Sequence, residues 1–103
     1  MEILDKYPIK SELVASRILQ DEAVIVLPME STIYTFDPVG TRIFELSTGR
    51  KKVAEIINTI QDEYDVQLSE AKQDTIEFIN DLSTKKILSL KEAPVADEND
   101  SIA

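Results

Sequence analysis

The dipeptide Asp37-Pro38 divides the chain into a part with strand-like patterns and a part with helix-like patterns. An aspartate carboxylate accepts hydrogen bonds from the free amides of a first helical turn, and proline is favoured at the first helical position. Before this dipeptide, β-branched and apolar runs alternate with polar turns; after it, apolar residues recur at spacings of three and four. The sequence therefore predicts strands first and helices second.

Three segments before Asp37 predict strands. Ala23–Leu27 is apolar at consecutive positions, which is typical of a central strand with both faces covered. Segment 13–19 is less cleanly patterned, whereas Thr32–Phe36 is rich in β-branched and aromatic residues. No crossover helix fits between these segments, so we expect an antiparallel sheet. Residues 2–12 show no clear period.

Three helices and a short closing strand are expected after the sheet. The first helix is short, and the second runs from about Lys51 to Tyr64. Ser69 is a suitable N-cap for a third helix from Glu70 to about Lys86, with Lys85 in its last turn. The strand follows at 87–90. The predicted fold is a winged-helix-like α+β domain over residues 1–90, and the polar segment 91–103 is predicted to be a disordered acidic tail.

The composition excludes most kinds of catalytic site. The chain has no Cys and no His, so thiolate metal sites, cysteine nucleophiles and histidine bases are absent, and two glycines cannot form a phosphate-binding loop. The net charge of −9 repels nucleic acid and anionic lipid. No signal sequence or membrane span is recognisable. We therefore expect a soluble, cytoplasmic protein that is not an enzyme and has no cofactor or metal.

The third predicted helix has two distinct flanks. At 100° per residue, a core stripe is formed by Ala71, Thr75, Phe78, Ile79 and Leu82. One flank carries Asp74, Glu77, Asp81 and Lys85, which predicts a solvated surface. The other flank places Ile76 among polar residues, namely Lys72, Asn80 and Ser83. Ile76 either packs on a neighbouring segment or lines a groove, and the sequence leaves both readings open.

The order of these residues resembles the PqqD family, that is, pyrroloquinoline quinone biosynthesis protein D and related precursor-peptide recognition elements. The resemblance spans about residues 8–90. It rests on the runs Val24–Val26, Thr32–Gly40 and Ile43–Leu46, on Gly49, on the spacing of Val53, Ile56, Ile60 and Tyr64, and on Asp74, Phe78, Leu82 and Ile87-Leu88. The chain departs from the family pattern at Phe36-Asp37, where Leu-Asn is usual, at Lys52, where Thr or Ser is usual, and at Lys86, where glycine is common.

The resemblance implies a non-catalytic peptide chaperone. Such proteins bind the leader, the recognition segment of a ribosomally made precursor peptide, and present it to a modifying enzyme, often a radical SAM protein. The leader adds as a strand beside the third strand and lies against the third helix, as an open sheet edge permits. The implied contact residues are Thr32, Ile33, Tyr34, Thr35, Phe36, Lys72, Ile76, Ile79, Asn80 and Ser83.

Two other functions stay open at this stage. A winged-helix transcription regulator would use a basic recognition helix, but the third helix carries more acidic than basic residues, and Arg50-Lys51-Lys52 is the only basic run. A structural subunit without a peptide ligand has no distinguishing sequence feature. We expect no nucleic acid partner and a monomer or weak homodimer. The sequence does not identify the precursor peptide or the enzyme, or indicate which alternate amides of the third strand face outward.

Overall fold

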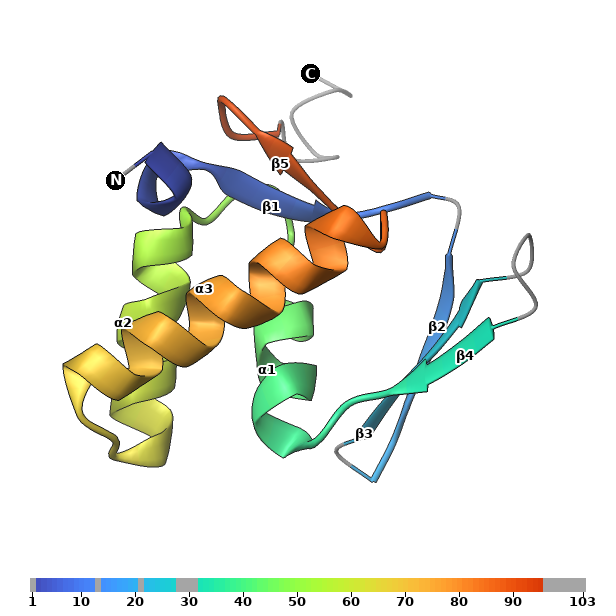
Figure 1. Ribbon diagram of the computed structural model, residues 1–103, viewed down its shortest axis with the longest axis horizontal. Helices are drawn as coiled ribbons and strands as arrows, with labels where there is room; N and C mark the ends of the chain where they lie inside the picture. The colour runs from blue at the N-terminus through green and yellow to red at the C-terminus, as the bar shows by residue number, and fades with distance from the viewer. Residues whose placement is uncertain (1, 13, 21, 28–31, 96–103) are drawn as a thin grey trace, which may run out of the picture.

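The computed structural model of the chain describes residues 2–12, 14–20, 22–27 and 32–95 (Figure 1). A three-stranded antiparallel sheet is followed by three helices, and a two-stranded sheet joins the beginning of the chain to the end of the helical part. This confirms the predicted α+β fold. The elements are η1 (Glu2–Asp5), β1 (Tyr7–Lys10), β2 (Ala15–Leu19), β3 (Glu22–Leu27), β4 (Thr32–Thr35), α1 (Pro38–Leu46), α2 (Val53–Tyr64), α3 (Leu68–Thr84) and β5 (Leu88–Lys91).

The larger sheet has the strand order β2-β3-β4, so β3 is the central strand, as its apolar run predicts. Ala23, Ile25 and Leu27 point alternately into the core, while Val24 and Val26 are only half-buried on the opposite face. The helices therefore cover one face of the sheet, and the other face is more open than the sequence pattern suggests. In Figure 1 this sheet stands to the right of the helices, with β4 in front of β3.

The predicted cap at Asp37 is confirmed. Its Oδ1 accepts a hydrogen bond of 2.7 Å from the Gly40 amide, at the first turn of α1. The second helix begins at Val53, slightly later than expected, with the Lys52 amide donating to Glu55 Oε1. Arg42 of α1 makes a bidentate pair with Glu63 of α2, with N–O distances of 2.8 and 2.9 Å, and so ties these two helices together on the surface.

The predicted ends of the third helix are wrong by a few positions. The N-cap of α3 is Gln67 rather than Ser69, because Val66 in the short α2–α3 connection packs on the core and brings the chain into the helix early. Lys85 is the C-cap, and Lys86 follows it with φ of 63°, so both lysines lie just beyond the last turn. Glycine adopts such a positive φ without strain, so the backbone at Lys86 suits glycine better than lysine.

β1 has no counterpart in the sequence prediction. It pairs antiparallel with β5, with Tyr7 opposite Lys91 and Lys10 opposite Leu88. Lys91, predicted to start a disordered tail, is thus the last residue of a strand. The segment after it also makes contacts: Glu92 forms an ion pair with Lys6, and the Val95 amide donates to the Gly49 carbonyl at 2.7 Å. Residues 96–103 of the predicted tail lie outside the described residues.

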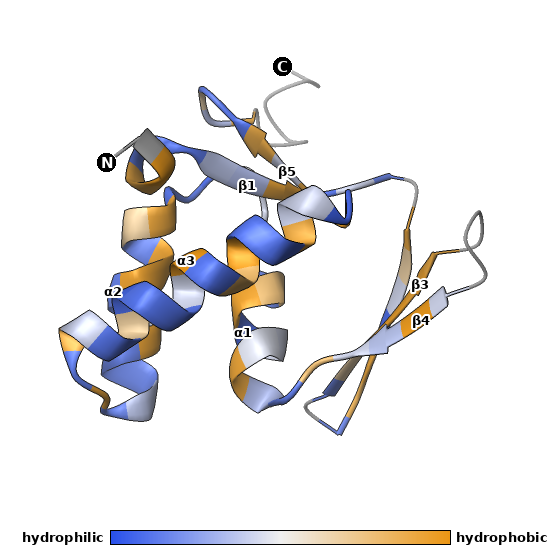
Figure 2. Ribbon diagram, viewed as in Figure 1, coloured by the Kyte–Doolittle hydropathy of each residue, from blue (hydrophilic) through white to orange (hydrophobic). Residues whose placement is uncertain are grey.

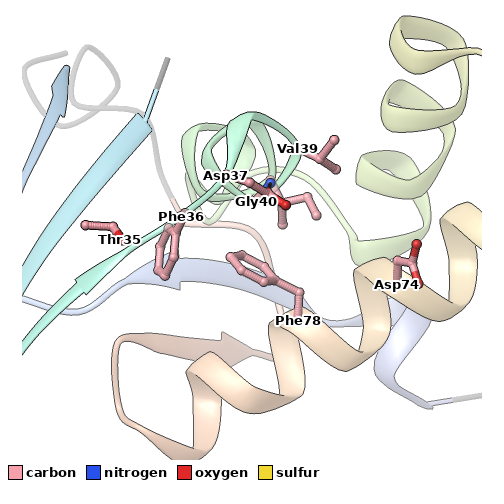
Figure 3. Close-up of a pocket in the computed structure, with 8 residues that line it drawn as sticks. Thr35, Phe36, Asp37, Val39, Gly40, Asp74 and Phe78 are labelled. Atoms are coloured by element: carbon pink, nitrogen blue, oxygen red, sulfur yellow. Dashed lines mark hydrogen bonds between the residues drawn. The ribbon is translucent and has the colours of Figure 1, made fainter. Parts of the chain in front are cut away.

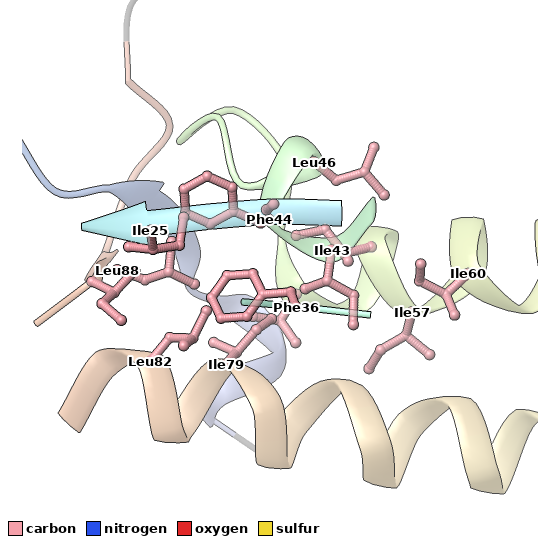
Figure 4. Close-up of a cluster of buried hydrophobic side chains, with 14 of the residues drawn as sticks. Ile25, Phe36, Ile43, Phe44, Leu46, Ile57, Ile60, Ile79, Leu82 and Leu88 are labelled. Carbon is pink, nitrogen blue, oxygen red and sulfur yellow. The ribbon is translucent and has the colours of Figure 1, made fainter. Parts of the chain in front are cut away.

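The core lies between the larger sheet and the helices. Figure 4 shows side chains from β3, α1, α2, α3 and β5 meeting in one cluster, with Phe36 near its centre. The stripe predicted for α3 is largely confirmed, since Ala71, Thr75, Ile79 and Leu82 are buried. The face of α3 turned to the viewer in Figure 2 is mostly hydrophilic. Among the described helices, none is long and apolar enough to cross a membrane.

Candidate functional site

Among the described strands, β4 lies at the edge of its sheet and pairs with β3 on one side only. The amide of Phe36, directly after β4, donates to the Ala23 carbonyl at 3.0 Å. Phe36 and Ala23 continue the register in which Thr35 faces Val24 and Tyr34 faces Ile25. In an antiparallel ladder, hydrogen-bonded and non-hydrogen-bonded pairs alternate.

The amides and carbonyls of β4 therefore divide into two sets. Those of Tyr34 point toward β3, like the Phe36 amide, whereas those of Ile33 and Thr35 point away from the sheet, toward its free edge. The Ile33 side chain is itself 66% exposed. Two residues of β4 thus offer main-chain donors and acceptors to another strand. The structure therefore indicates which alternate amides of this strand face outward, a point that the sequence leaves open.

Thr41 of α1 fixes the end of this edge. Its buried hydroxyl accepts a hydrogen bond of 2.7 Å from the Ala23 amide and donates one of 3.3 Å to the Phe36 carbonyl. The hydroxyl thus bridges the Ala23 amide and the Phe36 carbonyl, in place of a direct hydrogen bond between them. This bridge ties the start of α1 to the end of β4 and to β3.

A hollow of about 430 Å³ lies where the end of β4, the start of α1 and the side of α3 meet (Figure 3). Phe36 and Phe78 form its aromatic wall, with ring centroids 5.0 Å apart in an edge-to-face arrangement. Gly40 brings α1 close to that wall, since a Cβ atom there would lie 3.0 Å from the Phe78 ring. The lining residues are Thr35, Phe36, Asp37, Val39, Gly40, Ile43, Asp74 and Phe78.

Lys85 bridges α3 and β4 farther along the same side. Its ammonium lies 4.9 Å from the centroid of the Tyr34 ring and donates to Asp81 Oδ2 at 2.6 Å. The hydrogen bond to Asp81 raises the pKa of Lys85. The flank of α3 that carries Asp74, Asp81 and Lys85 therefore faces β4, although the sequence pattern indicates only a solvated surface there.

The residues predicted on α3 do not gather at this hollow. Lys72 and Ile76 line a separate hollow, of about 360 Å³, whose described lining comes from α3 alone, with Ser69, Gln73 and Glu77. Ile79 is fully buried, so its proposed contact with a peptide is wrong. Asn80 is exposed and Ser83 half-buried, and neither lines the hollow beside β4. Of the predicted residues, those of segment 32–36 are the ones at the edge or in the hollow.

Phe78 and Asp74 also line the hollow, although neither is among the contact residues expected from the sequence. Phe78 is half-buried rather than buried, because it stands at the margin of the core stripe, nearest the flank that faces β4. Its position at that margin, next to Asp74 on the helical circumference, was the signal available in the sequence.

Two comparisons with known proteins found matches to this chain. The family model described as coenzyme PQQ synthesis protein D (PqqD) matches residues 22–88. The solved structure of TbiB1 in complex with the TbiA(beta) leader peptide aligns with a TM-score of 0.72 and 30% sequence identity, covering 86% of this chain and 99% of that chain. No curated protein matches the sequence significantly.

Proposed function

Because the chain belongs to the PqqD family, we propose that it is a non-catalytic peptide chaperone that binds the leader of a ribosomally made precursor peptide and presents it to a modifying enzyme. The observation that carries this proposal is the free edge of β4 beside the hollow on α3. Ile33 and Thr35 supply paired donors and acceptors, and the Phe36–Phe78 wall supplies an apolar surface next to them. Main-chain hydrogen bonds to the added strand would supply affinity, and the hollow would determine which leader residue lies opposite each residue of β4.

The structural relative supports the same mode. TbiB1 is a protein of similar fold that was solved with a leader peptide, and nearly the whole of that chain aligns with this one. A leader strand added to β4 would continue the antiparallel sheet and bring its inward side chains against α3. We place Ile33, Thr35 and the hollow residues in the binding site, and we retain Thr32, Tyr34 and Phe36 as contacts.

A second, separate hypothesis is that the peptide also contacts four residues of α3, namely Lys72, Ile76, Asn80 and Ser83. The hollow beside Ile76 has one apolar residue among polar ones and lies on the other flank of α3. A peptide that continued past β4 and around α3 would reach it, but the edge and the Phe78 hollow account for the binding mode without it.

The other functions are not favoured. Within α3, Glu70, Asp74, Glu77 and Asp81 outnumber the single lysine, Lys72, and the whole chain carries a charge of −9. A helix of this charge repels the phosphate backbone instead of binding it. A purely structural subunit would have no use for an open strand edge beside an aromatic hollow.

The partner enzyme and the location are further parts of the proposal. The family resemblance implies a radical SAM enzyme, and a monomer or weak homodimer leaves the β4 edge free for the leader. A cytoplasmic location follows from the ligand, because a precursor made on ribosomes is first available there. The chain needs no cofactor for this role, because binding and presentation involve no bond making.

The test uses synthetic peptides from the N-terminal halves of short open reading frames encoded beside the gene. Each peptide is titrated against the full chain, and amide hydrogen exchange is measured with and without it. We expect one peptide to bind and to protect the amides of Ile33 and Thr35, while Tyr34, already bonded to β3, changes little. Absence of binding, or binding that leaves Ile33 and Thr35 unprotected, would contradict the proposal.

A further inference from the structure

Asp74 lies at the rim of the hollow. It is exposed on α3 and forms no ion pair with any residue in the described part of the chain. Asp37 contributes a second carboxylate to the lining, with one oxygen engaged by the Gly40 amide. The nearest described cation on this flank, Lys85, is already paired with Asp81. The hollow therefore carries an excess of negative charge.

The walls between these carboxylates are apolar. Phe36, Phe78, Val39 and Ile43 line the hollow, and the two aromatic rings meet edge to face. Such a site suits a side chain with a long aliphatic stem and a cationic end. The stem covers apolar surface, the cation is attracted by an aromatic face, and the head reaches a carboxylate at the rim. A purely apolar side chain would cover the same walls but would offer Asp74 no charged partner.

The geometry of β4 indicates which leader residue reaches the hollow. In an added strand, side chains opposite Tyr34 and opposite Phe36 share the inner face, because alternate residues point to the same side. The residue opposite Tyr34 comes next to Lys85, and the residue opposite Phe36 comes next to the hollow. These two leader positions are separated by one intervening residue.

We propose that the leader residue opposite Phe36 is a lysine or arginine, whose stem lies against Phe78 and whose charged head pairs with Asp74. This inference rests on the proposed function and specifies the ligand of the same site. The chain as a whole carries a charge of −9, which attracts a peptide with a local positive charge before contact is made. The pairing then selects the register of the leader along β4.

The experiment is a selection of random dodecapeptides, displayed on phage, against the immobilised full chain. The same library is selected against Asp74→Asn and against Asp62→Asn, a matched control that removes one exposed carboxylate of α2 outside the hollow. We expect the parent and Asp62→Asn to enrich strand-forming peptides with one lysine or arginine at a fixed position. We expect Asp74→Asn to enrich strand-forming peptides without that preference.

A titration measures the size of the effect with one enriched peptide. Replacing its basic residue with methionine, or Asp74 with asparagine, should each weaken binding by about two- to five-fold, and the two changes together should not weaken it further. Asp74→Lys should recover affinity for the same peptide with glutamate at that position.

The outcomes separate the two proposals. Enrichment of peptides that lack a basic preference, or a preference unchanged in Asp74→Asn, would overturn this inference and leave the peptide-binding function intact. Enrichment of no peptide by any of the three proteins would overturn the proposed function together with it.

Discussion

Phe36 and Phe78 meet edge to face, with ring centroids 5.0 Å apart and ring planes inclined by 78°. One ring belongs to the residue that follows β4, and the other belongs to α3, more than forty positions later in the chain. A third ring, that of Phe44 in α1, has its centroid 5.8 Å from that of Phe36. These contacts set the separation between the β4 edge and α3, and so they determine how much room a peptide has there.

Phe78→Ala tests this contact. We expect the protein to fold with a loss of about 2 kcal/mol, less than for a fully buried phenylalanine because Phe78 is half-exposed, and to bind the leader peptide at least ten-fold more weakly. Urea unfolding and peptide titration are the measurements. The half-buried Ile76, on the other flank of α3, is the matched position.

Ile76→Ala should lower stability by a comparable or smaller amount and leave the peptide affinity within about two-fold of the parent. Ile76→Glu adds a charge on the same flank and should also leave binding unchanged. If the Ile76 variants weaken binding and Phe78→Ala does not, the leader lies on the flank that the sequence pattern suggested.

Local interactions were predictable from the sequence, and long-range ones were not. The Asp37 cap and the central position of Ala23–Leu27 depend on residues close together in the chain, and both are confirmed. β1 depends on pairing with β5, some eighty positions away, and Pro8 interrupts any alternating pattern within it. A strand that depends on a distant partner need not show a strand pattern in its own residues.

Which flank of α3 faces β4 also depends on long-range contacts and was not predictable from the sequence. A helical angle indicates that Ile76 lies on one side of the core stripe and Asp74 on the other, but it contains no information about which side faces β4. That depends on the path from β4 through α1, which Thr41 and the Phe36–Phe78 contact determine. The edge position of β4 was predictable, because it follows from the order of the strands.

Thr41→Val tests the tie between α1 and the sheet. Valine has a similar shape but removes the acceptor of the buried Ala23 amide, and we expect a loss of about 1–3 kcal/mol in the free energy of unfolding. Thr41→Ser keeps the hydroxyl and is the control. The measurement is urea unfolding, with the slopes compared to confirm a common unfolded state. Equal stability of the valine and serine variants would show that the hydroxyl bridge contributes nothing.

The Arg42–Glu63 pair gives a pH dependence of defined sign. The hydrogen bond from Arg42 lowers the pKa of Glu63 in the folded state. The pair therefore contributes stability above the unfolded glutamate pKa of about 4.3 and loses it as the pH falls through the lower folded value. The parent should exceed Glu63→Gln in thermal midpoint at pH 7, and the difference should vanish in acid. A difference that grew on acidification would contradict this linkage.

Two deletions test the contacts of the chain after β5. Removing residues 92–103 eliminates the Val95–Gly49 hydrogen bond and the Lys6–Glu92 pair, and it should lower the thermal midpoint by roughly 4–8 °C. Removing only 96–103 leaves every described contact in place and should shift the midpoint little. Thermal unfolding followed by circular dichroism measures both. Equal losses from the two deletions would place the stabilising contacts beyond Val95.

Proline substitutions on β4 test the docking edge itself. The Ile33 amide points to the free edge, so Ile33→Pro should fold, because proline is tolerated on an edge strand where its missing N–H faces outward. The Tyr34 amide points toward β3, so Tyr34→Pro should lose a ladder bond and be destabilised by about 3 kcal/mol or more.

The peptide titration then separates fold from function. Ile33→Pro removes a main-chain donor that the added strand requires, and we expect a loss of roughly ten-fold in affinity. Ile33→Thr changes the same exposed side chain but keeps the amide, so it should bind nearly like the parent. If Ile33→Pro folds and binds the leader as tightly as Ile33→Thr does, no strand pairs with this edge, and the peptide must dock elsewhere. If Tyr34→Pro is as stable as the parent, the assignment of the two amide sets is reversed, and Tyr34 becomes the position whose amide the peptide uses.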